Sequence, residues 1–308
     1  MKTQSRLQRI LVLLTVVVLT FTSCAANSAS VSPSSQSPPK QGTFPIPAFQ
    51  DAVFHENLAV DCGSLLLDDS GLKQGYVAVR AEGDSRMKFQ IIHGDIKYNY
   101  DLPSGQETVF PLNMGNGDYT FRLMEQVSGS KYACVWSGNR HVTMDDEFQP
   151  FLRPSQMVNY HQDSDCVAKI RELASHCDTD AEVASAVYDY LVEHIRYDKQ
   201  KAATVQSGYL PFPDETLRTG KGICFDYAAL AAGMLRSVGI PCKLITGYVE
   251  QETYHAWNSF FLKEQGWVTV EIRAQVNSWQ RVDITFAAGG TPTDRLTNDS
   301  LYTTRYVY

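Results

Sequence analysis

A cysteine, a histidine and an aspartate in the C-terminal half of the chain have the types and the order that thiol-based acyl transfer needs. Cys224 stands in GKGICFDYAAL, His255 follows 31 residues later in YHAWN, and Asp283 lies in WQRVDITFAA. A thiol attacks a carbonyl carbon only as a thiolate, and an ordinary pKa of about 8.5 leaves a few per cent ionised at neutral pH. A histidine would hold it ionised and later protonate a leaving amine, while the carboxylate fixes the imidazole tautomer. The three residues therefore predict a catalytic triad.

The segment around the cysteine predicts a helix that would favour the thiolate. An apolar run from Ala228 to Leu235 indicates a buried helix that Gly239 and Pro241 end. Glycines upstream predict a turn, so the cysteine falls in the first turn of the helix. There the helix dipole and the unpaired backbone N–H groups favour negative charge.

Three blocks in this region resemble the transglutaminase-like superfamily of papain-type thiol enzymes. They are GxGICFDYAALxxxMLRxxGIPxKLxxGY, then YHAWN, then WxxVDxTFAA, and they extend over roughly residues 158–290. The resemblance implies an α+β papain-like core, with Cys224 on the central helix and His255 and Asp283 on neighbouring strands of an antiparallel sheet. It also implies attack on an amide or ester carbonyl, a thioester intermediate, and resolution by water or by an amine.

The third member of the triad has an alternative. In many relatives the acid follows the histidine by about fifteen residues, which falls near Glu271 in GWVTVEIRA. Asp283 is preferred because VDITFAA resembles the family's D-x-T-F block, and a hairpin from Val268 to Ile284 would absorb the extra residues. Glu271 is the alternative acid.

Other groups at the site are less specific. The Cys224 N–H would donate to the oxyanion, and Tyr209 and Gln206 in VQSGYLPFPDE are candidates for a second donor. The other six histidines show no ligand spacing with cysteines or carboxylates, so we expect no metal site and no cofactor.

The N-terminus predicts export. Three basic residues precede LVLLTVVVLTFTSC, an apolar run too short to span a bilayer comfortably, so residues 1–23 are predicted to be a lipoprotein-type signal peptide. Cys24 follows a lipobox-like segment in which Phe21 replaces the usual Leu, and its lipidation would anchor the protein outside the cytoplasmic membrane. Cleavage by an ordinary signal peptidase would instead release it. Residues 24–45, rich in Ser and Pro, are predicted to be a flexible tether.

The charge of the chain limits its partners. The formal net charge of −7 becomes −10 without residues 1–23, which hold three basic and no acidic residues. This argues against nucleic-acid binding and against electrostatic docking to anionic lipid. We expect a protein or peptide substrate, including cell-wall peptide, and contact with the membrane only through the lipid anchor.

Residues 46–148 predict a small antiparallel β-sandwich. Apolar residues recur with period two between Ala59 and Met144, in short runs separated by turn signals such as Asn116-Gly117. This pattern indicates roughly six or seven strands. Cys62 and Cys134 flank the domain and are candidates for a disulfide outside the cell.

Residues 149–308 predict the catalytic domain. A helix is expected near Asp165 to Ser175, and a second begins at a capping box formed by Thr179 and Glu182. Tyr197 and Asp198 are expected to close that second helix. The tail LYTTRYVY alternates and predicts a final strand.

Three functions are compatible with these features. The first is a surface-anchored thiol hydrolase that cuts peptide or isopeptide bonds. The second is a protein-glutamine gamma-glutamyltransferase, which would need an aromatic tunnel for the amine, for which Trp257, Trp267 and Trp279 are candidates. The third is a catalytically silent surface scaffold whose β-sandwich binds a partner.

Overall fold

Alternating apolar residues build two four-stranded antiparallel sheets in the first half of the described chain. The structure is a computed structural model that describes residues 41–249, 253–274, 279–283 and 302–308, without the side chains of 249, 253, 271–274 and 279–283. The predicted signal peptide, Cys24 and most of the predicted tether lie outside this description. No helix among the described residues is long and apolar enough to cross a membrane.

The two sheets form the predicted sandwich, with eight strands. On β4, Met87, Phe89 and Ile91 are buried and alternate with more exposed residues. Phe89 stacks on Phe110 of the other sheet at 5.2 Å between ring centroids, so the inner faces pack together. One sheet has the order β1 (Val60–Asp61), β2 (Leu66–Asp68), β3 (Tyr76–Arg80), β6 (Thr108–Pro111), and the other β5 (Ile96–Leu102), β4 (Met87–His93), β7 (Gly117–Ser128), β8 (Lys131–Val142).

The candidate disulfide of the sandwich is not formed. Cys62 and Cys134 are both free cysteines. The Cys62 Sγ lies 3.6 Å from the carbonyl oxygen of Val60, and the Cys134 Sγ lies 3.2 Å from that of Trp136. Cys62 follows β1 and Cys134 lies on β8, in different sheets, so flanking the domain in sequence did not bring the two thiols together.

Five α-helices lie between the two sheet regions of the sequence. The predicted capping box is present in part: Thr179 accepts a hydrogen bond from the Glu182 N–H at 3.2 Å. Asp198 does not close a helix as expected but caps the next one, where its Oδ1 accepts from the Lys201 N–H at 2.8 Å. The helices are α1 (Asp165–Ala174), α2 (Asp180–His194), α3 (Lys199–Thr204), α4 (Pro213–Thr219) and α5 (Cys224–Ser237), with 3₁₀ turns η1 (Leu72–Gln74) and η2 (Gln149–Phe151).

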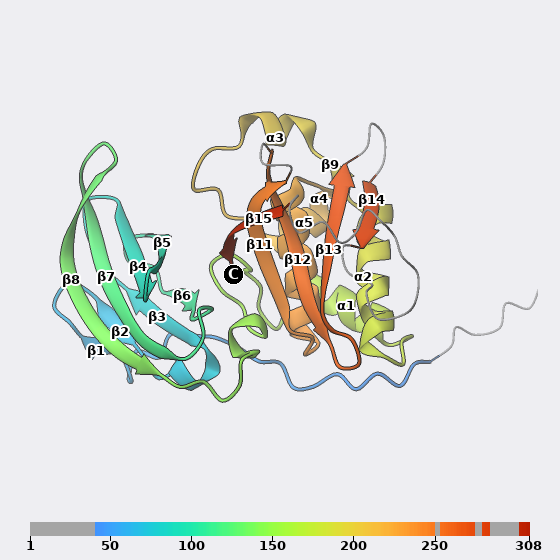
Figure 1. Cartoon of the computed structure of the whole chain (residues 1–308), viewed down its shortest axis with the longest axis horizontal. Helices are drawn as coiled ribbons and strands as arrows, with labels where there is room; N and C mark the ends of the chain where they lie inside the picture. The colour runs from blue at the N-terminus through green and yellow to red at the C-terminus, as the bar shows by residue number, and fades with distance from the viewer. Residues whose placement is uncertain (1–40, 250–252, 275–278, 284–301) are drawn as a thin grey trace, which may run out of the picture. The chain divides into compact units, whose positions relative to one another are not determined.

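A five-stranded antiparallel sheet completes the α+β fold, which confirms the predicted class. Helix α5 packs against β11 and β12 (Figure 1), and the Asn258 Nδ2 donates to the Ala228 carbonyl oxygen at 2.9 Å. The predicted hairpin and the predicted final strand are both present as backbone. The strand order is β14 (Trp279–Asp283), β13 (Gly266–Ala274), β12 (Thr253–Leu262), β11 (Cys242–Val249), β15 (Tyr302–Val307), and a separate short parallel pair joins β9 (Arg196–Tyr197) to β10 (Lys221–Gly222).

Candidate active site

Helix α5 presents Cys224 as its first residue. The helix is held by its buried apolar residues, including Ala229, Leu230 and Leu235, which explains why the run of alanines and leucines becomes the central helix. The first N–H groups of a helix have no intrahelical acceptor, so the Cys224 N–H can donate to a developing oxyanion. The Cys224 side chain is half-buried.

Cys224 and His255 line the same cavity. It has a volume of about 540 Å³. His255 lies on β12, opposite Gly247 of β11, in the strand whose other face packs on α5 through Asn258. The predicted nucleophile and base, 31 residues apart in the sequence, therefore share one concave surface. Lining the same cavity is a necessary condition for proton exchange between the two side chains.

The two candidate acids lie on successive strands. Glu271 is on β13, which is hydrogen-bonded directly to the strand of His255, whereas Asp283 is on β14, one strand further out. With about 4.8 Å between neighbouring strands, β14 is roughly 10 Å from β12. The side chains of both acids lie outside the described residues, so the choice between them stays a prediction.

The two candidate oxyanion donors also line the cavity, but both have other partners. The Tyr209 hydroxyl donates to Oδ1 of Asp226 at 2.5 Å. Burial, then the hydrogen bond to Asp226 and its charge, raise the pKa of Tyr209, so the hydroxyl keeps its proton. The Gln206 amide donates to the Thr204 carbonyl oxygen at 2.8 Å. The single Tyr209 proton is thus directed at Asp226.

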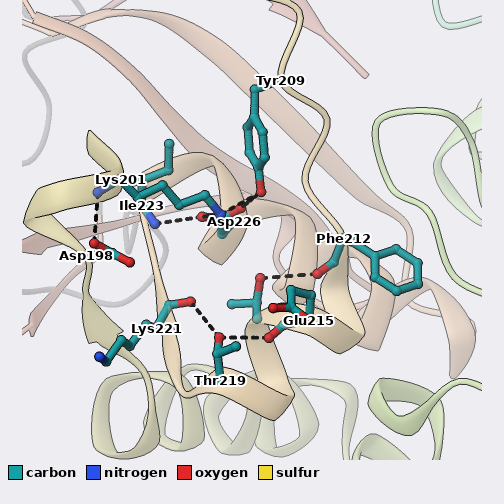
Figure 2. A network of polar contacts seen from close by, with 10 residues as sticks. Asp198, Lys201, Tyr209, Phe212, Glu215, Thr219, Lys221, Ile223 and Asp226 are labelled. Carbon is teal, nitrogen blue, oxygen red and sulfur yellow. Dashed lines mark hydrogen bonds and ion pairs between the residues drawn. The ribbon is translucent and has the colours of Figure 1, made fainter. Parts of the chain in front are cut away.

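Asp226 is a residue of the site that the sequence analysis did not predict. It is the third residue of α5 and is 0% exposed. Its Oδ2 accepts from the Ile223 N–H at 2.8 Å and lies 2.7 Å from the Lys201 Nζ (Figure 2). A carboxylate at this helix position is a capping signal, and CFDYAAL contained it. Its partner Lys201 lies 25 positions earlier, and nothing in the sequence linked the two.

Gly222 explains part of the glycine-rich approach. A Cβ added there would lie 2.8 Å from the Cβ of Asp226, closer than real side chains approach. Gly220 has φ of 61° and ends α4 in the left-handed conformation. The two glycines therefore have separate roles, one closing a helix and one making room for the buried carboxylate.

Exposed and charged residues complete the cavity lining. The segment after α3 contributes Val205, Gln206 and Ser207, all exposed, so water reaches the cavity. Lys88 of β4 and Asp101 of β5 also belong to the lining. In the part of the chain that the structure describes, no group of three or more His, Cys, Asp or Glu side chains could hold a metal ion.

Comparisons with known proteins find similarity in the part of the chain that contains Cys224 and His255. The model of the Transglutaminase-like superfamily matches residues 168–272. A kyphoscoliosis peptidase from Homo sapiens is 30% identical over 122 residues, which cover 39% of this chain and 18% of that protein. A protein-glutamine gamma-glutamyltransferase from Pseudomonas aeruginosa is 30% identical over 115 residues, 33% of this chain and 17% of that protein. The match thus spans less than a fifth of the length of either relative.

Among solved structures, a transglutaminase from red sea bream is 12% identical, with a TM-score of 0.28, over 71% of this chain and 49% of that one. The family match contains Cys224, His255 and Glu271, and the fold around them is the expected mixture of helices and antiparallel sheet. Over residues 168–272 this chain is therefore similar to the transglutaminase-like superfamily.

Proposed function

We propose that this protein is a thiol hydrolase that cleaves peptide or isopeptide bonds through a thioester on Cys224. The observation that carries the proposal is the shared cavity of Cys224 and His255, with the cysteine at a helix N-terminus. The matching superfamily is named after transglutaminases, and the names of the two relatives above, a peptidase and a glutamyltransferase, both denote reactions at an amide carbonyl.

The proposed reaction uses the described groups in two halves. The Cys224 thiolate attacks the amide carbon, and the new oxyanion accepts a hydrogen bond from the Cys224 N–H. His255, which took the thiol proton, gives it to the leaving nitrogen as the C–N bond breaks, so that an amine departs and a thioester remains. His255 then removes a proton from water, whose oxygen attacks the thioester carbon. The C–S bond breaks and a carboxylic acid leaves the restored thiol.

Sheet order supports Glu271 as the group that orients His255. A triad acid must reach the imidazole Nδ1 within hydrogen-bond distance, and Glu271 is on the strand next to β12. Asp283 is one strand further away. We therefore propose Glu271 as the acid and keep Asp283, the preferred candidate of the sequence analysis, as the alternative.

Water is the proposed acceptor because the cavity is open to it. An amine acceptor must exclude water from the thioester. Of the tryptophans considered for an amine tunnel, Trp267 is outside the cavity lining and packs on Lys243, with the ammonium 3.6 Å from the ring centroid. Trp257 is buried against Ile245 and lines only a much smaller hollow beside Cys224. Glutamyl transfer to a lysine amine is the second candidate, supported by the name of the Pseudomonas aeruginosa relative.

The site of action is also proposed. We infer that the signal peptide is removed before Cys24 and that the lipidated cysteine anchors the enzyme on the outer side of the cytoplasmic membrane, where its substrates would be extracytoplasmic proteins or cell-wall peptide. Metabolic labelling with a radioactive fatty acid tests the anchor. The Cys24→Ser variant should lose the label.

The experiment for the reaction uses p-nitrophenyl acetate as an activated acyl donor. The wild type is expected to give a burst of p-nitrophenolate and an acetyl adduct on Cys224 by mass spectrometry, followed by turnover. Cys224→Ala should abolish both, and Cys134→Ala, which removes an exposed thiol of the sandwich, should abolish neither. Equal rates in all three proteins would contradict the thiol hydrolase proposal and favour the catalytically silent scaffold. If the acyl group is transferred to a fluorescent primary amine in preference to water, the proposed function would be transamidation instead of hydrolysis.

A further inference from the structure

We propose that Lys201 is a positioning residue for the thiol of Cys224: its ammonium group balances the buried carboxylate of Asp226, so that the N-terminus of α5 still favours a thiolate. This inference rests on the proposed function, because it concerns the activation of the same cysteine. It adds a group outside the triad that would determine whether Cys224 is reactive.

The carboxylate of Asp226 is enclosed and fully partnered. It is 0% exposed, and its two oxygens receive the Ile223 N–H, the Tyr209 hydroxyl and the Lys201 ammonium at 2.8, 2.5 and 2.7 Å. The carboxylate accepts all three hydrogen bonds, and one of the donors is a cation. Asp226 therefore places a full negative charge two residues from the nucleophile.

Lys201 and Tyr209 form a closed triangle with that carboxylate. The Lys201 Nζ donates to the Tyr209 hydroxyl oxygen at 2.6 Å and lies 4.4 Å from the centroid of its ring, while the same hydroxyl donates to Asp226. The Lys201 backbone is fixed as well, because its N–H donates to Asp198 at the start of α3. Figure 2 shows the lysine and tyrosine side chains converging on Asp226 from outside α5. The ammonium is thus held at one place.

The charge of Asp226 is larger than the partial positive charge of the helix N-terminus. A helix N-terminus acts like roughly half a positive charge. The charge of Asp226 alone would exceed that and oppose a second negative charge on the sulfur. With the ammonium of Lys201 at 2.7 Å, the pair is neutral and the helix end keeps its positive character. The lysine, 28% exposed, is shielded from water more than a surface ion pair would be.

Other titratable groups around the thiol come from several elements. Burial raises the pKa of Tyr197, Tyr209 and Tyr308, so these three tyrosines stay neutral. Lys88 and Asp101 of the sandwich contribute opposite charges, 3.8 Å apart. The described titratable groups near the Cys224 thiol come from both parts of the chain. They are Tyr197 of β9, Lys201 of α3, Tyr209 after α3, Asp226 of α5, Tyr254 and His255 of β12, Tyr308 after β15, Lys88 of β4 and Asp101 of β5.

The test measures the rate of Cys224 alkylation by iodoacetamide against pH, with mass spectrometry to locate the adduct. Lys201→Met is expected to move the midpoint of the profile upward by about one pH unit, which lowers the rate near pH 6 roughly tenfold. Lys201→Arg should keep the wild-type profile. The double variant Lys201→Met/Asp226→Asn should restore it, because both charges are then absent.

Lys221 offers a matched control. It is exposed and lies three residues before Cys224, and its side chain points away from Asp226 in Figure 2. Lys221→Met removes the same charge from the neighbourhood without touching the triangle, so its profile should match the wild type. If Lys201→Met and Lys221→Met behave alike, the inference is wrong.

If Lys201→Met does not fold, Asp226→Asn provides a second test of the inference. Asp226→Asn alone keeps the shape of the side chain and leaves Lys201 uncompensated, so its midpoint should move downward. An unchanged midpoint in Asp226→Asn would overturn the inference. If the wild type itself alkylates like a free thiol and His255→Ala changes nothing, then the proposed function fails first. Activation that depends on His255 but not on Lys201 would remove only this inference.

Discussion

Arg236 on α5 and Tyr308, which directly follows β15, are joined by a hydrogen bond although they are 72 positions apart in the sequence: the Arg236 Nη2 donates to the Tyr308 carbonyl oxygen at 2.9 Å. The same guanidinium donates to the Cys242 and Arg153 carbonyl oxygens at 2.8 and 2.9 Å. Arg236 is 1% exposed. One buried side chain therefore connects the C-terminal end of α5 to three separate segments.

Replacing this arginine should cost much of the stability of the fold. Arg236→Met fills a similar volume but leaves three carbonyl groups without their charged donor, and we expect the free energy of unfolding to fall by about 3 kcal/mol or more. Urea unfolding followed by tryptophan fluorescence measures this. Arg218→Met is the control, because Arg218 pairs with Glu215 on the exposed surface and should change little. If both variants lower the free energy of unfolding equally, the buried hydrogen bonds of Arg236 contribute no more to stability than a surface ion pair.

The acid of the triad is expected to be Glu271. Glu271→Gln should lower the rate of p-nitrophenyl acetate turnover by about a hundredfold or more, since a neutral partner no longer holds the imidazole in the right tautomer. Asp283→Asn should lower it less than about fivefold, because β14 is one strand further from His255. The two variants remove the same charge from adjacent strands. A larger loss in Asp283→Asn would return the role to the residue that the sequence pattern favoured.

A pH effect on stability is expected from the sandwich. Burial acts in the opposite direction, but hydrogen bonds from Ser70 and His55 hold the pKa of Asp68 below its ordinary value. The His55 Nδ1 lies 3.0 Å from Asp68 Oδ2, and the His55 N–H donates to the same oxygen at 2.7 Å. Because the folded pKa is depressed, this contribution is present above about pH 4 and is lost as the pH falls through the folded value.

Asp68→Asn should therefore lower the free energy of unfolding at pH 6 and flatten its fall below pH 4. Urea unfolding at half-unit steps from pH 2.5 to 6 measures both. Asp118→Asn is the control, since its carboxylate is 89% exposed beside His141. Parallel curves for Asp68→Asn and wild type would show that Asp68 does not contribute to acid sensitivity.

The sequence predicted local features better than distant pairings. The run from Ala228 to Leu235 identified helix α5, because a continuous apolar segment that ends near Gly239 is typical of a buried helix. Period-two patterning identified the strands of the sandwich. The unformed disulfide between Cys62 and Cys134 and the contact between Tyr209 and Asp226 depend on which segments meet in space, and neither is written in local patterning.

The role of Asp198 shows the same limit at short range. Its position after an amphipathic helix suggested a C-terminal cap, yet aspartate accepts backbone N–H groups and therefore suits the start of α3. The choice between Glu271 and Asp283 stays a prediction: sheet order favours Glu271, whereas the D-x-T-F block favoured Asp283. Sequence reasoning supplied the two candidates, and the order of the strands adds a reason to prefer Glu271.

Gly222 is expected to relate the glycine-rich segment before α5 to the reactivity of the Cys224 thiol. A methyl group at this position would lie 2.8 Å from the Asp226 Cβ and 3.2 Å from the Thr216 Cγ2. Both neighbours are buried, so the added atom must displace the carboxylate or the start of α5. Gly222→Ala should lower the free energy of unfolding by about 1–3 kcal/mol. It should also slow iodoacetamide alkylation of Cys224, since the triangle around Asp226 would shift with it. Gly83→Ala is the matched control: its nearest neighbour is the flexible Met87 Sδ at 3.2 Å, which can move aside. If Gly222→Ala alkylates and unfolds like Gly83→Ala, the glycine is not required for the placement of Asp226.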